Sequence, residues 1–178
     1  PNASQLRGLQ DRLGDDLDVF RPELILCIAI VFSLLLRLMK SFDSVHRVPL
    51  AIAFVTAALA FLVAQWPEAG GEAFSGLLVL DAWAAWFRIF ILLATLLVLV
   101  LAWLTGLPDT DDSGDFVVLL LGAALGLMLM TSANHLLILF LAIEMASLPS
   151  YALAGFLKGR VTGSEAALKY VVYGAASS

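Results

Sequence analysis

Two ionisable side chains stand out because they interrupt long apolar runs near the end of the sequence. Glu144 lies within the run from Leu136 to Phe156, which is otherwise uncharged, and Lys169 lies about two turns into the next apolar run. A charged group near the centre of a bilayer costs about 2.5 to 3.5 kcal/mol on insertion scales, so such groups usually serve a function. An acid followed by a base in this setting indicates a proton or ion relay.

The position of Glu144 suits a proton acceptor. It follows Asn134 by ten residues, about 15 Å along a helix, which is half of a hydrocarbon core of about 30 Å. The alternative is a protonated carboxyl that fixes helix packing through hydrogen bonds. Pro149 removes one backbone hydrogen bond, and the kink that it predicts either opens carbonyls to water or serves packing alone.

Lys169 has two interpretations. It lies about 9 Å into the membrane from Gly163, whereas Glu144 lies about 18 Å from the same surface, so direct contact is not predicted. Lys169 either tunes the proton affinity of Glu144 through water or a further group, or it extends to the surface and pairs with Glu165. Glu165 is therefore a secondary candidate.

Two further residues are secondary site candidates. Arg88 lies five residues inside Trp83, and we expect its side chain to extend to the interface rather than line a path. His135 is nine residues from Glu144 and out of phase with it on a helix, which favours a structural role at the helix boundary.

Composition excludes most other classes of protein. Hydrophobic residues make up 61% of the chain and charged residues 14%, whereas about a quarter of a soluble domain is charged. Cys27 is the single cysteine, which excludes disulfides, zinc clusters and iron–sulfur ligation by this chain. No nucleotide-binding motif or basic patch for nucleic acid is present. We expect an integral membrane protein that holds neither a cofactor nor a metal.

The apolar runs predict an all-α, polytopic transmembrane protein. A sixth run is still apolar at Ser178, short of the about 20 residues that a span needs, and the chain starts with Pro1, so we expect the N-terminal fragment of a longer, antiporter-like fold. Residues 1–21 form an extramembrane or interfacial segment, either an interfacial helix or an amphipathic lead-in, and residues 22–178 form the transmembrane domain. The predicted helices cover about 22–39, 49–66, 83–104, 116–131, 134–156 and, truncated, 163–178.

Other features concern packing and orientation. The small residues Gly122, Gly126, Ala142 and Ala146 are expected at helix contacts, and the apolar surfaces predict lateral packing against other membrane subunits and the lipid bilayer. Lysine and arginine residues flanking the spans favour an N-terminus outside.

Four segments near the end of the chain resemble a known family. Residues 130–136, 141–151, 163–170 and 174–178 resemble the subunit N family of proton-pumping NADH:quinone oxidoreductase, respiratory complex I, an antiporter-like membrane subunit. The resemblance implies that Glu144 matches the essential mid-membrane glutamate and Lys169 the conserved lysine of the following helix. It also implies two inverted repeats, a bacterial inner (plasma) membrane, neighbouring antiporter-like subunits, and flavin and iron–sulfur clusters in partner subunits.

Three functions are compatible with these features. The first is proton translocation driven by redox chemistry elsewhere in a NADH:quinone oxidoreductase, with Glu144 and Lys169 as site residues and no redox chemistry in this chain. The second is a subunit of a cation/proton antiporter or membrane-bound hydrogenase. The third is a membrane scaffold in which both residues only join helices.

Overall fold

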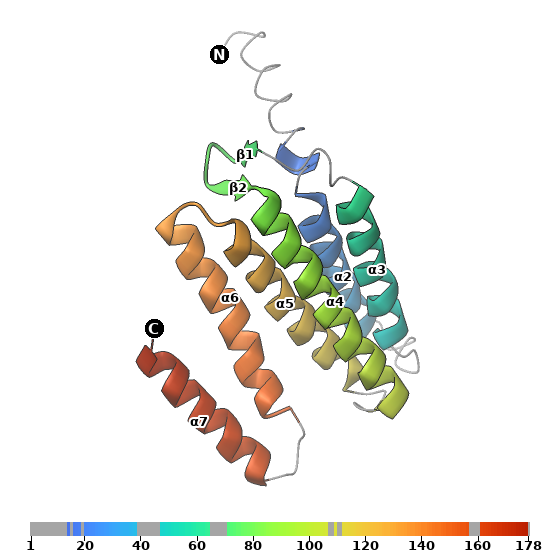
Figure 1. Cartoon of the computed structure of the whole chain (residues 1–178). Helices are drawn as coiled ribbons and strands as arrows, with labels where there is room; N and C mark the ends of the chain where they lie inside the picture. Colours follow the sequence, from blue (N-terminus) through green and yellow to red (C-terminus); the bar gives the residue numbers. More distant parts are fainter. Residues whose placement is uncertain are drawn as a thin grey trace.

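The chain folds into a layered set of antiparallel helices with one small hairpin (Figure 1). The computed structural model describes residues 14, 16–18, 20–38, 47–64, 71–106, 109, 112–156 and 161–177. Its elements are α2 (Arg21–Leu38), α3 (Arg47–Ala64), β1 (Gly71–Ala73), β2 (Leu78–Leu80), α4 (Ala82–Thr105), α5 (Ser113–Ser132), α6 (Leu136–Ala154) and α7 (Val161–Ser177).

The predicted all-α membrane fold is confirmed. Each predicted span is a helix whose ends differ from the prediction by three residues or fewer, the largest shift being the start of α5 at Ser113 rather than 116. Within the part of the chain that the structure describes, four helices, α3 to α6, are long and apolar enough to cross a membrane, and α2 and α7 are not among them. Over its 18 residues α2 carries Arg21, Glu23 and Arg37, and α7 has 17 residues. The predicted amphipathic segment before α2 falls mainly on residues 1–13, outside the described residues.

Helices α2, α3, α4 and α5 form a bundle around one apolar core. Helix α2 packs on α3 and α5, α4 packs on the same two helices, and α6 and then α7 are added on the outer side of α5. Burial of apolar side chains and close packing stabilise this arrangement. The buried core residues are Leu26, Ala29, Val48, Ala51, Val55, Ala58, Leu62, Leu92, Leu99, Val117, Leu121, Leu125 and Met128.

Small residues set the distance between α5 and α6. A Cβ atom on Gly126 would lie 2.4 Å from the backbone nitrogen of Ala146, so only glycine permits this approach. Gly122 faces Pro149 of α6, and Ala142 is 1% exposed. The prediction that these small residues lie at helix contacts is confirmed, and the contacts are within this chain. Helix α6 continues through Pro149 to Ala154.

The segment between the predicted helices 49–66 and 83–104 contains a β-hairpin that the sequence analysis did not predict. Strands β1 and β2 pair antiparallel, each three residues long. Its turn includes Gly76, whose φ of 84° suits glycine. The hairpin is attached to the connection between α5 and α6: the Asn134 backbone N–H donates to the Leu77 carbonyl and its side-chain amide donates to the Gly76 carbonyl, both at 2.9 Å.

Helix α4 has a cap at each end. The Asp81 carboxylate accepts a hydrogen bond from the Ala84 backbone N–H at 2.8 Å, which satisfies one of the free donors of the first turn. Gly106, at φ 67°, ends the helix in the left-handed conformation, and its N–H donates back to the last turn. The N-terminal cap sets the start of the helix, so that Arg88 is its seventh residue and lies in the second turn.

Candidate functional site

Glu144 occupies the middle of α6. It is the ninth residue of this 19-residue helix and its side chain is partly buried. Its carboxylate has no ion-pair or hydrogen-bond partner among the residues that the structure describes. This agrees with the different depths of Glu144 and Lys169, which did not predict direct contact between them.

The side of α6 that carries Glu144 is turned away from α5. At 100° per residue, Ala142, Ala146 and Pro149 cluster on the side that meets α5, and Glu144 lies opposite them. Tyr151 lies within about 20° of Glu144 on this wheel and packs on α7. The carboxyl thus belongs to the side of α6 on which α7 packs.

Aromatic and small residues form the contact between α6 and α7. The rings of Tyr151 and Tyr170 meet edge to face with centroids 4.8 Å apart. The Tyr151 hydroxyl lies against Gly174, where a Cβ atom would be 2.1 Å from its oxygen. Gly155 meets Ala167 in the same way near the start of α7. Helix α7 is therefore held against the C-terminal half of α6.

Hydroxyl groups extend from Glu144 towards this contact. The Ser147 hydroxyl donates to the Glu144 carbonyl at 3.3 Å, and the Ser150 hydroxyl donates to the Ser147 carbonyl at 2.7 Å. Ser150 Oγ also lies 3.3 Å from Tyr170 Oη across the helix interface. The sequence analysis missed these hydroxyls, although on the helical wheel of α6 Ser147 lies only about 60° from Glu144, while Ser150 lies about 120° from it.

Lys169 is not brought together with Glu144. Lys169 Nζ lies 2.6 Å from Glu165 Oε1, with the two side chains 64% and 59% exposed. On the α7 wheel both residues lie on the side opposite Tyr170 and Gly174, which face α6. The interpretation in which Lys169 pairs with Glu165 is confirmed, and any effect on Glu144 acts over a distance.

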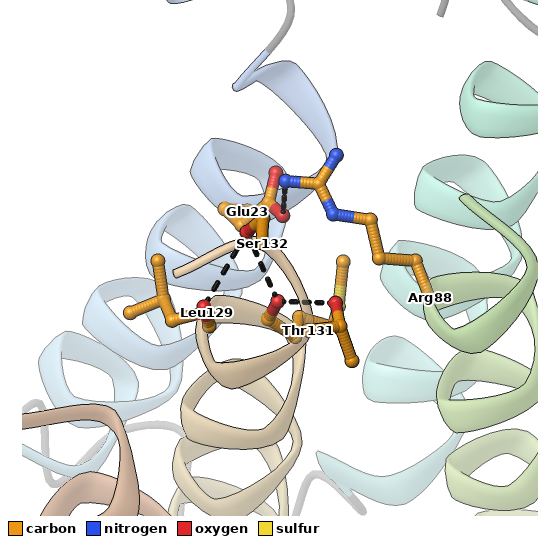
Figure 2. A network of polar contacts seen from close by, with 6 residues as sticks. Glu23, Arg88, Leu129, Thr131 and Ser132 are labelled. Atoms are coloured by element: carbon orange, nitrogen blue, oxygen red, sulfur yellow. Dashed lines mark hydrogen bonds and ion pairs between the residues drawn. The ribbon is translucent and has the colours of Figure 1, made fainter. Parts of the chain in front are cut away.

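Arg88 corrects a sequence-based expectation. We expected its side chain to extend to the interface, but it is 2% exposed and Arg88 Nη2 lies 2.5 Å from Oε1 of Glu23, which is fully buried. Figure 2 shows this pair between α2 and α4, near Ser132 at the end of α5. A charge buried without its partner costs several kcal/mol. Each member of this pair therefore offsets the cost of burying the other inside the bundle.

Glu23 was missed because it lies only two residues after the start of its helix, where an acid is ordinary. A signal was nevertheless present. Helices α2 and α4 start at the same end of the bundle (Figure 1), so an acid and a base in their first two turns lie at similar depth. A search of the sequence for opposite charges at similar depth in the membrane on different helices would have identified Glu23 and Arg88.

His135 has a structural role. Its Nδ1 accepts a hydrogen bond from the Leu137 backbone N–H at 3.2 Å, which caps the start of α6. Its ring is exposed and is not joined to Glu144 by any contact that the structure describes. This agrees with the boundary role that the sequence favours.

Basic residues meet the start of α5 at the opposite end of the bundle. Arg37 of α2 forms an ion pair with Asp115, and the Arg47 guanidinium lies directly over Gly114. Asp115 also lines an open pocket of about 370 Å³ between α5 and α6, together with Phe156. Among the described residues, no three His, Cys, Asp or Glu side chains gather in a group that could hold a metal ion.

Comparisons with known proteins give a consistent result. The sequence profile of a family described as NADH:quinone oxidoreductase/Mrp antiporter, TM matches residues 133–178. The chain is 30% identical to NADH-quinone oxidoreductase subunit N of Chlorobium chlorochromatii (strain CaD3) over 100% of its own length and 35% of the relative. It is 36% identical to the protein of that name in Anaeromyxobacter sp. (strain Fw109-5), over 89% of this chain and 31% of the relative.

A third relative carries a different name. NAD(P)H-quinone oxidoreductase subunit 2 of Synechococcus sp. (strain CC9311) is 35% identical over 88% of this chain and 30% of its own length. The chain thus spans about a third of the length of these curated relatives. The matched family region contains α6 and α7, with Glu144, Lys169 and the contact between the two helices. The chain belongs to the family of antiporter-like membrane subunits of NADH:quinone oxidoreductase.

Proposed function

We propose that this chain is part of a subunit that moves protons across the membrane, driven by electron transfer elsewhere in a NADH:quinone oxidoreductase complex. Glu144 is its central proton acceptor, and the charge of Lys169 on α7 tunes the proton affinity of Glu144 from a distance. The chain performs no redox chemistry, and flavin and iron–sulfur clusters belong to partner subunits. Its partners are other membrane subunits, including further antiporter-like ones, and the surrounding lipid.

One observation carries this proposal. Glu23, Arg88 and Lys169 each have an ion-pair partner, whereas the Glu144 carboxylate has none among the described residues. A charged acid in the middle of an apolar transmembrane helix costs several kcal/mol of free energy. Because no basic side chain of the described residues pairs with it, this carboxylate is available to a proton or to water, which suits a translocation site.

The proposed location is the bacterial inner membrane, with the start of α2 on the outer side. Arg37 and Arg47 lie at the other end of the bundle, at the start of α5, and lysine and arginine are enriched on the cytoplasmic side. The hairpin then lies outside.

Exposed apolar residues of α4, including Trp86, Phe87 and Phe90, supply surface for lipid or a neighbouring subunit.

Glu144→Gln tests the proposal in the assembled complex reconstituted into vesicles. The amide keeps the shape and hydrogen-bonding capacity of the side chain, so we expect normal assembly and NADH oxidation with most coupled proton pumping lost. Glu72→Gln, at an exposed acid of β1, is the matched control and should pump normally. Normal numbers of protons per electron in the Glu144→Gln complex would favour the scaffold function instead.

A second candidate function is cation/proton antiport in a complex without NADH oxidation, because the family description also names the Mrp antiporter. Isolation of the native complex separates the two functions. Co-purification with flavin and iron–sulfur subunits supports the oxidoreductase. Their absence, together with sodium-dependent proton release, supports antiport.

A further inference from the structure

The two sides of α6 differ sharply in chemistry. The side against α5 is made of small apolar residues such as Ala142 and Ala146. The other sides carry Glu144 and the hydroxyls of Ser147 and Ser150, which are only partly buried. Polar groups on a transmembrane helix normally face other polar groups or a water-filled path rather than lipid.

The hydroxyls of Ser147 and Ser150 both lie on the C-terminal side of Glu144 along α6. Ser147 lies about 4.5 Å along the helix from Glu144, and Ser150 about 9 Å, both towards the end of α6 where α7 begins. There Ser150 Oγ lies 3.3 Å from Tyr170 Oη of α7. Tyr170 is 46% exposed, so its hydroxyl can meet both Ser150 and the surroundings of α7.

The crossing between the helices is held in place by packing. The Tyr170 ring meets the Tyr151 ring edge to face, and the Tyr151 hydroxyl lies against Gly174. The Tyr170 hydroxyl therefore has a fixed position, and its ring can keep that position without the hydroxyl.

We propose that Ser147, Ser150 and Tyr170 line the route by which protons reach Glu144 from the side of α7. This inference rests on the proposed function of Glu144 as a proton acceptor. Tyr170 and Ser150 are the point at which the route crosses from α7 to α6. The three hydroxyls pass protons on, and Glu144 is the group that holds the proton.

The chemistry is proton exchange along hydroxyl groups and water. Each hydroxyl has one proton to donate and lone pairs to accept another. It takes a proton on its oxygen while it releases its own to the next acceptor, so that none is left charged and one proton moves in total. Water carries the steps between hydroxyls that do not touch, and the Glu144 carboxylate takes the last proton and becomes neutral.

Tyr170→Phe is the first test, in the assembled complex in vesicles. It removes the hydroxyl and keeps the ring contact with Tyr151. A directly positioned proton-transfer group contributes about 100-fold or more, and water can replace part of a relay, so we expect the rate of pumping to fall about tenfold. Tyr173→Phe is the matched control, since Tyr173 is on the same helix, is 73% exposed and should pump normally.

Ser150 supplies the second test. Ser150→Ala should slow pumping and increase its solvent isotope effect, and Ser150→Thr should restore both because it retains the hydroxyl. A merely structural role would leave the isotope effect unchanged. Unchanged pumping in both Tyr170→Phe and Ser150→Ala would overturn the route, and it would leave the proposed function in place if Glu144→Gln still abolished pumping. Loss of assembly in Tyr170→Phe would assign Tyr170 to packing and likewise overturn its place in the route.

Discussion

Arg88 of α4 and Glu23 of α2 form a buried ion pair, with Arg88 Nη2 at 2.5 Å from Glu23 Oε1. Both residues lie in the first two turns of their helices, and α2 and α4 start at the end of the bundle next to the β-hairpin (Figure 1). Glu23 Oε2 and Arg88 Nε have no hydrogen-bond partner among the described residues, so each charge depends mainly on the other. The pair therefore fixes the position of α2 against α4 more strictly than apolar packing alone would.

Removal of one partner of this pair should be strongly destabilising. Arg88→Ala leaves the Glu23 carboxylate buried without a counter-charge, which should lower the free energy of unfolding by about 3 to 5 kcal/mol. The double variant Glu23→Leu with Arg88→Met should recover most of this loss, because no charge is left buried. The measurement is the free energy of unfolding in mixed micelles titrated with SDS.

The exposed pair of α7 is the control for this prediction. Lys169→Ala breaks an ion pair whose side chains are 64% and 59% exposed, and such pairs contribute about 1 kcal/mol or less. Equal losses for Arg88→Ala and Lys169→Ala would contradict the burial of the Glu23–Arg88 pair.

Gly126 and Gly122 should respond to alanine with opposite signs. A Cβ atom at Gly126 would lie 2.4 Å from the Ala146 nitrogen and 2.7 Å from the Met145 carbonyl carbon, both backbone atoms. Helices α5 and α6 must then separate, at a cost of about 1 to 3 kcal/mol. A Cβ at Gly122 would meet Pro149 at 3.6 Å, an ordinary contact, so Gly122→Ala should gain up to about 1 kcal/mol of helix propensity.

The same SDS titration of both alanine variants checks this prediction. The matched pair removes the general effect of replacing glycine in a helix, because both sites lie in α5. Comparable stability of the two variants would mean that α5 and α6 are further apart than the contact at Gly126 requires.

Substitutions of Lys169 should affect pumping less than Glu144→Gln does. Its ammonium group is paired with Glu165 and lies on the side of α7 away from Glu144, which suits tuning rather than obligatory transfer. We expect partial loss of protons per electron for Lys169→Ala, and a smaller loss for Lys169→Arg, which keeps the charge. If Lys169→Ala were as inactive as Glu144→Gln, Lys169 would be an obligatory proton carrier.

Asn134 should control how firmly the hairpin is attached to the bundle. Asn134→Ala removes the side-chain hydrogen bond to the Gly76 carbonyl, and the hairpin should open more often. The measurement is the rate of cleavage at Glu72 of β1 by a glutamate-specific protease in the assembled complex. Ser75→Ala, an exposed turn residue, is the control, and equal cleavage of both variants would argue against this attachment.

The helices could be predicted from the sequence because a long apolar run in a membrane can adopt only a helix if its backbone groups are to be hydrogen-bonded. In lipid a backbone must satisfy its own hydrogen bonds, so runs such as 83–104 and 134–156 become helices with ends close to the predicted ones. The placement of Gly126 and Ala146 at helix contacts was also predictable, since small residues allow helices in a membrane to approach closely.

The tertiary partners of charged residues were harder to predict. The identity of Arg88 says nothing about which helix it meets, and its partner Glu23 lies on a helix that is distant in sequence. The hairpin was missed for a related reason, because its attachment depends on Asn134, far along the chain. Periodicity describes one element at a time, whereas these features depend on how elements come together.

The pairing of Glu23 with Arg88 also determines which charges respond to membrane voltage. A neutral pair of opposite charges at similar depth gains almost no net energy from the field, because the work on one cancels the work on the other. Glu144 changes its net charge by one when it binds a proton in the middle of α6. At about half the membrane depth this is worth about 1.2 kcal/mol per 100 mV. Among these three groups, Glu144 is therefore the one whose protonation the membrane potential can drive.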